Sequence, residues 1–298
     1  MEVGDLPLKD KIVVVTGGGS GIGLEIVKLA TTVGAKVVLA DLRLSAEAEA
    51  FVKSQNSKSL VFQKCDVSKR RDQERLVTAA EEQWGDVPDV YIASAGLFEP
   101  SSSNFWTDTE QDDYATVAVN VTAPIKLTRI AVRACLRAGK KGVVLLVASI
   151  AGYGGTYAVP LYCATKHAAV GFVKSMRKAD AEEGVKVVAL CPGVVRTPLW
   201  NPDAGTDLLK DFRYHESTIL EPRDVASAAV RLVEAGKYGG GTVLEVTTNG
   251  TRVIPEWGVM PPPQAEKNTG APSEIVPPLK VEVKDYLVKE RGPARAKL

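Results

Sequence analysis

The chain has 298 residues, 45% of them hydrophobic, and a formal net charge of +1. This length is enough for one large domain, or two small ones, with a sizeable core. The near-neutral charge argues against a nucleic-acid partner and an acidic membrane surface, and no apolar stretch is long enough to span a bilayer, so we expect no membrane partner.

Short β-branched runs alternate with longer segments of helical periodicity along the chain. We expect strands over 12–16, 36–40, 60–64, 90–93, 143–148, 185–190 and 242–246, and helices over 21–33, 45–54, 68–84, 110–138, 162–183 and 221–235. This alternation is typical of βαβ units around a buried parallel sheet. The expected fold class is α/β: a doubly wound Rossmann fold with a seven-stranded parallel sheet and helices on both faces.

The composition changes near Gly250. Of the 17 prolines in the chain, eight lie between Pro255 and Pro293. Prolines at this density exclude helix and discourage strand pairing. We therefore expect a single dinucleotide-binding and catalytic domain over 1–250 and a Pro-rich C-terminal extension over 251–298.

The termini and the cysteines indicate the compartment. The first residues lack the apolar region of a signal peptide, and the four cysteines form no Cys-x-x-Cys pair, so we expect free thiols and a cytoplasmic location. The alternative is a peroxisomal location, because the final Ala296-Lys297-Leu298 differs at one position from the Ser-Lys-Leu import signal. The two histidines, His167 and His215, lack acidic neighbours in ligand spacing, so no metal is expected.

A glycine-rich segment, Thr16-Gly17-Gly18-Gly19-Ser20-Gly21-Ile22-Gly23, lies between the first expected strand and the first expected helix. Glycines let the backbone turn tightly and approach a pyrophosphate, whose charge is stabilised by the amides at a helix N-terminus. An ordinary turn is the alternative for a glycine cluster alone. The strand and helix on either side favour phosphate binding.

An acidic residue, Asp41, follows the second expected strand, eighteen positions beyond Gly23. At this offset a dinucleotide site needs a carboxylate for the adenosine ribose hydroxyls. The same charge would repel the additional phosphate of NADP, so NAD is the preferred cofactor. Arg43 could meet a 2′-phosphate, which leaves NADP open as the alternative.

Tyr162 and Lys166 open a long helical segment and project from one face, one turn apart. A Tyr with a Lys four positions later is common by chance and proves nothing alone. Taken with the glycine segment, Asp41, Asp66, Asn120, Ser149 and Pro192-Gly193, however, the pair resembles the short-chain dehydrogenase/reductase family. The resemblance covers residues 9–250 in the family's order and spacing.

The resemblance implies four catalytic residues. Tyr162 would transfer the proton, and Ser149 would hydrogen-bond the substrate oxygen. Lys166 would hold the nicotinamide ribose and lower the pKa of the Tyr162 phenol. Asn120 would anchor a water that links Lys166 to solvent.

A nicotinamide dinucleotide is the cofactor that the resemblance implies. The glycines would bind its pyrophosphate, Asp41 the adenosine ribose, Asp66 with Val67 the adenine, and Thr197 the carboxamide. The expected cofactor-binding residues are Gly17, Gly19, Ser20, Gly21, Ile22, Gly23, Asp41, Leu42, Asp66, Val67, Ala95, Gly96, Tyr162, Lys166, Pro192, Gly193, Val195 and Thr197.

One departure from the family pattern follows the fourth expected strand. Ala93-Ser94-Ala95-Gly96 replaces the family's Asn-Asn-Ala-Gly. The first Asn of that pattern ties neighbouring strands together. Its absence predicts a slightly looser central sheet.

Aromatic side chains mark the expected substrate pocket. Tyr153, Tyr157, Trp200 and Tyr214 would line it together with Ser149, which favours a bulky or apolar alcohol or ketone. The alternative is that about half of these aromatics pack the loop that follows Pro192-Gly193.

The predicted function is NAD-dependent interconversion of a secondary alcohol and a ketone, with Tyr162 as general acid/base. An NADPH-dependent carbonyl reductase of a biosynthetic pathway is one alternative. A dinucleotide-binding scaffold without turnover is the other, although the presence of Ser149, Tyr162 and Lys166 favours catalysis. Family members pair through the helices expected near 110–138 and 162–183, so we expect a homodimer or a homotetramer.

Overall fold

The structure, a computed structural model, describes residues 2–55, 58–108, 113–201, 207–212, 214–255 and 288–289. Strands in these ranges form one sheet in the order β3-β2-β1-β4-β5-β6-β7-β8. Their bounds are β1 (Ile12–Thr16), β2 (Lys36–Asp41), β3 (Leu60–Lys64), β4 (Val90–Ala93), β5 (Gly142–Val147), β6 (Val185–Pro192), β7 (Val243–Thr247) and β8 (Gly250–Val253). The doubly wound α/β fold expected from the sequence is confirmed.

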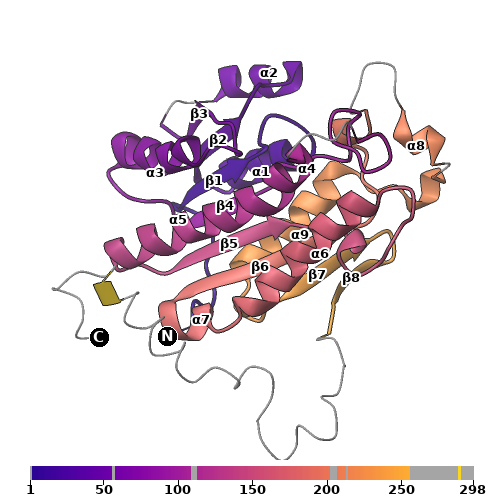
Figure 1. Cartoon of the computed structure of the whole chain (residues 1–298). Coiled ribbons are helices and arrows are strands. Elements are labelled where there is room, and N and C mark those ends of the chain that lie inside the picture. The colour runs from indigo at the N-terminus through magenta and orange to yellow at the C-terminus, as the bar shows by residue number, and fades with distance from the viewer. Residues whose placement is uncertain are drawn as a thin grey trace, which may run out of the picture.

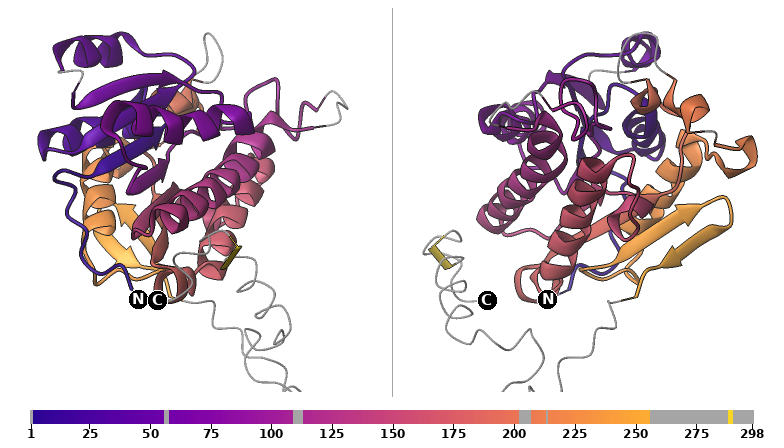
Figure 2. Two further views of the ribbon diagram at one scale, coloured as in Figure 1. Left: turned by 90° about the vertical axis from the view of Figure 1, so that its left-hand side faces the viewer. Right: turned by 45° about the vertical axis from the view of Figure 1, so that its right-hand side comes forward.

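The number of strands is corrected, because the sheet has eight strands and the last one is antiparallel. β8 pairs with β7 from Thr247↔Gly250 to Leu244↔Val253, and the two strands form one edge of the sheet (Figure 2). All four residues of β8 are exposed. The strand therefore lacks the apolar run by which the buried strands were found in the sequence.

Helices cover both faces of the sheet. Successive strand residues point to opposite faces, so Val13 and Val15 pack in the core with α1 and α9, while Val14 packs with α3, α5 and α6. Figure 1 shows α5 and α6 in front of the sheet and α9 behind it. The helix bounds are α1 (Gly21–Thr32), α2 (Ala46–Ser54), α3 (Arg70–Trp84), α4 (Ala115–Val117), α5 (Ala123–Ala138), α6 (Pro160–Ser175), α7 (Ala179–Glu183), α8 (Leu208–Asp211) and α9 (Pro222–Glu234).

Two long helices differ from their expected bounds. The helix expected over 110–138 begins at Ala115 as α4 and passes through a π-helical segment, η1 (Ala118–Thr122), into α5. The helix expected over 162–183 begins earlier, because Pro160 occupies the first turn of α6, where a missing N–H costs nothing. It also ends earlier, and α7 follows as a separate short helix whose Asp180 accepts a hydrogen bond from the Val3 N–H at 2.7 Å.

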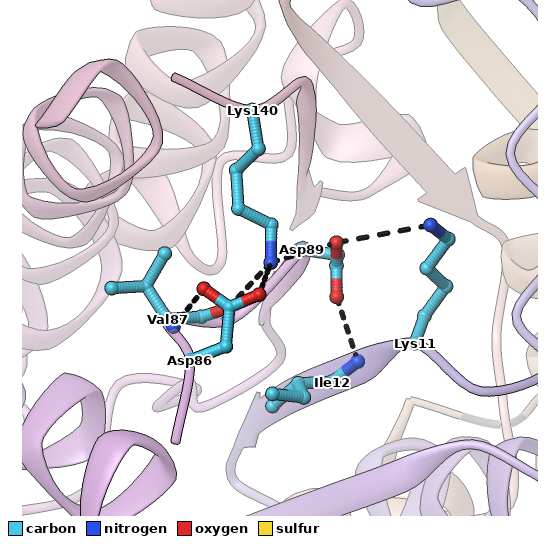
Figure 3. A network of polar contacts seen from close by, with 6 residues as sticks. All are labelled: Lys11, Ile12, Asp86, Val87, Asp89 and Lys140. Carbon is cyan, nitrogen blue, oxygen red and sulfur yellow. Dashed lines mark hydrogen bonds and ion pairs between the residues drawn. The ribbon is translucent and has the colours of Figure 1, made fainter. Parts of the chain in front are cut away.

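A polar network fixes the amino ends of β1 and β4 (Figure 3). Asp89 accepts a hydrogen bond from the Ile12 N–H at 2.9 Å, and its second oxygen lies 3.0 Å from Lys140 Nζ and 4.0 Å from Lys11 Nζ. Lys140 also donates to Asp86 at 2.8 Å. These contacts join the two central strands at the end of the sheet opposite the glycine segment.

At the carboxyl ends the same two strands remain paired where the family's Asn is replaced. Thr16 pairs with Ala93. The Thr16 hydroxyl donates a hydrogen bond to the Ile92 carbonyl at 3.3 Å, and the Thr16 carbonyl accepts one from the Ser94 N–H at 3.1 Å. These bonds join β1 and β4 without the missing side chain. The looser sheet expected from its absence stays a prediction.

Several other expectations concern the whole chain. All four cysteines are buried free thiols. Within the described ranges, no helix has the length and apolar character needed to cross a membrane, and no group of three or more His, Cys, Asp or Glu could hold a metal ion. Apart from residues 288–289, the Pro-rich extension beyond residue 255 lies outside the described residues, as does Ala296-Lys297-Leu298.

Candidate active site

A cleft of about 820 Å³ opens where the parallel strands end. Ligands collect at the carboxyl ends of strands in open α/β sheets, because the strand order reverses there and leaves a crevice. All of the residues expected to bind the cofactor line this cleft, and so does Ser149. The sequence motifs, although far apart in the chain, are therefore brought together in space.

The glycine segment passes close to its neighbours at several positions that admit no side chain, among them Gly17 and Gly23. Gly17 has a φ of +69°, and a Cβ there would lie 2.6 Å from the Ala95 nitrogen. A Cβ on Gly23 would lie 2.1 Å from the Gly17 carbonyl oxygen. The amino end of α1, which begins at Gly21 and has no side-chain cap from Ser20, therefore comes directly to the cleft. This cradle fits a pyrophosphate.

Two carboxylates lie at the ends of β2 and β3. One oxygen of Asp41 accepts a hydrogen bond from the Gly19 N–H at 2.9 Å, and the other accepts from the Arg43 N–H at 3.3 Å. Asp66 accepts from the backbone N–H and the hydroxyl of Ser68, at 3.0 and 2.7 Å. Asp41 is thus held against the glycine segment, where the ribose of a bound dinucleotide needs an acceptor.

Ser149, Tyr162 and Lys166 meet in the same cleft from two elements. Ser149 follows β5, while Tyr162 and Lys166 lie one turn apart on α6. The side chain of Ser149 lies close enough to that of Tyr162 to lower the pKa of the phenol. Lys166 Nζ lies 5.4 Å from the centre of the Tyr162 ring and donates to the Val147 carbonyl at 3.0 Å.

Burial dominates the electrostatics of this pair. It raises the pKa of Tyr162 above its usual range, and the nearby Ser149 hydroxyl opposes this only in part. Burial also lowers the pKa of Lys166 to about 8. The net direction for Tyr162 is thus opposite to the lowering expected from Lys166, because desolvation of the phenolate outweighs any attraction from the ammonium group.

Asn120 lies in the π-helical segment and outside the lining of the cleft. Its side-chain oxygen accepts from the Leu97 N–H at 2.9 Å, and its nitrogen donates to the Leu97 carbonyl at 2.9 Å and to the Thr165 hydroxyl at 3.1 Å. The side chain therefore joins the loop after β4 to α6. Its role in anchoring a water stays a prediction.

Only part of the expected substrate set lines the cleft. Trp200 and Tyr214 do, whereas Tyr153 and Tyr157 do not. Tyr153 follows the short helix η2 (Ile150–Gly152) and donates its hydroxyl to Glu245 on β7 at 2.6 Å. The side chain of Tyr157 is exposed. The structure therefore does not place these two residues in the lining of the cleft, although the sequence predicts them there.

The sequence reasoning missed the residues that complete the pocket. Phe98, Val159 and Cys163 line the cleft and form one buried cluster with Tyr162 and Trp200. The ring centre of Phe98 lies 4.6 Å from that of Tyr162 and 4.7 Å from that of Trp200. The position of Phe98, two residues after the Ala95-Gly96 pair, was the signal that could have identified it.

The family model described as short chain dehydrogenase matches residues 11–206, more than half of the chain. The chain belongs to the short-chain dehydrogenase/reductase family. Members of this family are oxidoreductases that bind a nicotinamide dinucleotide, and the cleft described above provides the cradle for it.

Curated relatives and a solved structure agree with this assignment. Short-chain dehydrogenase reductase 3a of Arabidopsis thaliana is 34% identical over 248 residues, covering 81% of this chain and 95% of the relative. The 2,5-dichloro-2,5-cyclohexadiene-1,4-diol dehydrogenase of Sphingobium indicum is 32% identical over 248 residues, with 80% and 95% covered. A crystal structure from Brucella melitensis, described as a short-chain dehydrogenase/reductase of the glucose/ribitol dehydrogenase type, has a TM-score of 0.68 and 28% identity, covering 80% of this chain and 95% of that one.

Proposed function

We propose that this short-chain dehydrogenase/reductase interconverts a secondary alcohol and a ketone, with NAD as cofactor and Tyr162 as general acid/base. The observation that carries the proposal is that Ser149, Tyr162 and Lys166 meet in the cleft that the glycine segment also lines. When bound there, NAD would supply the hydride acceptor or donor. The protein supplies orientation and the movement of a proton.

Proton transfer would take place at the phenol oxygen of Tyr162. A substrate oxygen placed beside the Ser149 and Tyr162 hydroxyls can give its proton to the phenolate, or take one from the phenol in the reverse direction. Because burial raises the pKa of Tyr162, the phenolate needs nearby positive charge near neutral pH. Lys166, one turn away on α6, is the cation placed to provide it once it is turned from the Val147 carbonyl.

Cofactor choice would follow from Asp41. Its fixed carboxylate lies next to Gly19, at the position where NADP carries its additional phosphate in this fold, and repulsion between the two charges favours NAD. One observation supports the alternative of an NADPH-dependent reductase, because Arg43 also lines the cleft two residues beyond Asp41.

Substrate choice would follow from the walls around Tyr162. Phe98, Val159 and Trp200 form an apolar surface there, whereas the carboxylates of the cleft lie at the end of β2 (Asp41) and beyond β3 (Asp66). Such a surface favours a neutral, bulky or apolar substrate, since burying a charged or heavily hydroxylated one would leave polar groups unpaired. The ring diol in the name of the Sphingobium relative fits this size and is a reasonable first probe.

A screen that follows NADH absorbance at 340 nm tests the proposal. Purified protein is incubated with NAD or NADP and a panel that pairs apolar cyclic secondary alcohols with small polyols. We expect turnover with NAD and the cyclic alcohols. Turnover confined to the polyols would reject the substrate class, and turnover confined to NADP would reject the cofactor.

Assembly and location complete the proposal. The outer faces of α5 and α6 would pair two copies, giving a homodimer or a homotetramer, and light scattering after gel filtration would show a monomer if this is wrong.

The cytoplasm is the proposed location. Peroxisomal import is the alternative. Fluorescent tagging of the N-terminus distinguishes a diffuse cytoplasmic signal from a peroxisomal one.

A further inference from the structure

A buried carboxylate outside the expected site, that of Glu99, contacts the backbone of Tyr162. One side-chain oxygen accepts a hydrogen bond from the Tyr162 N–H at 2.7 Å, and the other accepts from the Phe105 N–H at 3.3 Å. Only 5% of Glu99 is exposed. Both of its side-chain oxygens are thus engaged by backbone groups, one of which belongs to the proposed acid/base residue.

The start of α6 explains why this contact matters. The N-cap residue is Val159, whose side chain offers no acceptor, and Pro160 follows it. The first N–H groups of a helix have no partner within the helix, so the N–H of Tyr162 needs an acceptor from elsewhere. Glu99 provides one across 63 positions of sequence, and its negative charge interacts favourably with the helix dipole.

The backbone of Glu99 is held in an uncommon conformation. Its φ of +36° is rare for a residue with a side chain, and Pro100 further restricts the residue before it. The Glu99 carbonyl accepts a hydrogen bond from the side chain of Asn104 at 3.1 Å. Conformations of this kind persist only where the surrounding structure imposes them, and they concentrate at functional sites.

The neighbours of Glu99 hold other parts of Tyr162. The ring of Phe98 packs edge-on against the Tyr162 ring. The Thr165 hydroxyl donates to the Tyr162 carbonyl at 2.7 Å and accepts from Asn120. The N–H, the carbonyl and the ring of Tyr162 are thus all fixed, which leaves its hydroxyl for Ser149 and the substrate.

We propose that Glu99 is a positioning residue, which caps α6 at Tyr162 and thereby holds the phenol oxygen in line with Ser149 and Lys166. The inference rests on the proposed role of Tyr162 in proton transfer. Small misplacements of a reacting group reduce rates steeply, so loss of the cap should lower kcat more than it weakens binding.

The test compares Glu99→Leu, which removes both acceptors, with Glu99→Gln, which keeps one. Asp89→Leu is the matched control, because Asp89 is also a buried carboxylate that caps a backbone N–H, that of Ile12, at the opposite end of the sheet (Figure 3). Four quantities are measured: kcat and KM by NADH absorbance, NADH affinity by fluorescence, and amide hydrogen exchange over 160–166.

We expect Glu99→Leu to lower kcat about tenfold or more, with KM and NADH affinity changed less than about threefold and with faster exchange over 160–166. Glu99→Gln should stay within about threefold of wild type, as should the kcat of Asp89→Leu. An unchanged kcat or unchanged exchange in folded Glu99→Leu would overturn the proposal. If Glu99→Leu does not fold, a tenfold loss of kcat in folded Glu99→Gln would overturn it.

Failure of the underlying function gives a different result. If Tyr162→Phe turned over as fast as wild type, the proposed role of Tyr162 would be wrong, and Glu99 would then have no catalytic group to position. If Tyr162→Phe were inactive while Glu99→Leu remained fully active, only the inference about Glu99 would fail.

Discussion

The Asp41 carboxylate and the Gly19 N–H are joined by a 2.9 Å hydrogen bond that ties the end of β2 to the glycine segment. A Cβ on Gly19 would lie 2.8 Å from the Asp41 carboxyl carbon, so the two residues are in close contact. This relationship fixes a negative charge beside the pyrophosphate cradle. It is the structural basis of the proposed preference for NAD.

Asp41→Ala should shift that preference toward NADP. Removing the carboxylate removes both an acceptor for the ribose hydroxyls and the repulsion of a 2′-phosphate, so the ratio of the two dissociation constants should change about tenfold or more. The measurement is titration of each reduced cofactor by fluorescence. Asp66→Ala, on the expected adenine side, should weaken both cofactors alike. An unchanged ratio in Asp41→Ala would contradict the assignment.

Lys166→Met should stabilise the folded protein at neutral pH. The pKa of Lys166 lies at about 8 in the fold against a usual value of 10.5, so keeping the ammonium charged while buried costs up to about 3 kcal/mol. Between these two values the unfolded wild-type chain binds more protons than the folded one, and wild-type stability therefore rises with pH. The gain in the free energy of unfolding of Lys166→Met over wild type should be largest below pH 8 and shrink toward pH 10.5.

Urea unfolding of both proteins at pH 7 and pH 10 measures this difference. Burial raises the pKa values of Cys65 and Cys135 to about 12, and because Lys166 is not among the groups that shift them, these two thiols should affect both proteins alike. An advantage that is the same at both pH values, or larger at pH 10, would show that the Lys166 ammonium is not desolvated as described.

Trp200→Ala should reduce discrimination in favour of bulky apolar substrates. Trp200 lines the cleft beside Phe98, and loss of a buried aromatic surface of this kind is worth about 1.5–3 kcal/mol, or roughly tenfold to a hundredfold in kcat/KM. The ratio of kcat/KM for a cyclic and a small alcohol measures it. Trp106→Ala, at an exposed position outside the cleft, is the matched control and should leave the ratio unchanged.

Lys140→Met should destabilise the fold through the network shown in Figure 3. Lys140 Nζ lies 3.0 Å from the carboxylate of the buried Asp89. Without it, the Asp89 charge would keep only the Ile12 N–H and the more distant Lys11 as partners. We therefore expect the free energy of unfolding to fall by about 1–3 kcal/mol. The control is Lys53→Met, because the Lys53 side chain is 79% exposed and its pair with Glu49 contributes little. Equal melting temperatures for the two variants would contradict this role.

Short motifs with fixed spacing made the nucleotide site and the parallel strands predictable from the sequence. The glycine segment and Asp41 are recognisable because backbone approach and charge impose residue types at set offsets along one βαβ unit. The alternation of apolar runs likewise identified every parallel strand of the sheet. β8 was missed because its exposed residues carry no such pattern.

Contacts across long sequence separations could not be predicted. Glu99 reads as an ordinary loop carboxylate until the fold brings it to the N–H of Tyr162, 63 positions away. The sequence predicts Tyr153 in the substrate pocket as one of several aromatics, but its hydroxyl reaches Glu245 and it does not line the cleft. The direction of a side chain after a short helical turn depends on tertiary contacts that spacing does not encode.

The most direct test of the account compares Tyr162→Phe with Tyr153→Phe in the NADH assay. Each variant loses one phenol oxygen, yet only Tyr162 lines the cleft beside Ser149 and Lys166. We expect Tyr162→Phe to lose about 10²–10⁴-fold in kcat with NADH affinity retained, and Tyr153→Phe to remain within about twofold of wild type. Wild-type kcat in Tyr162→Phe would contradict the central claim.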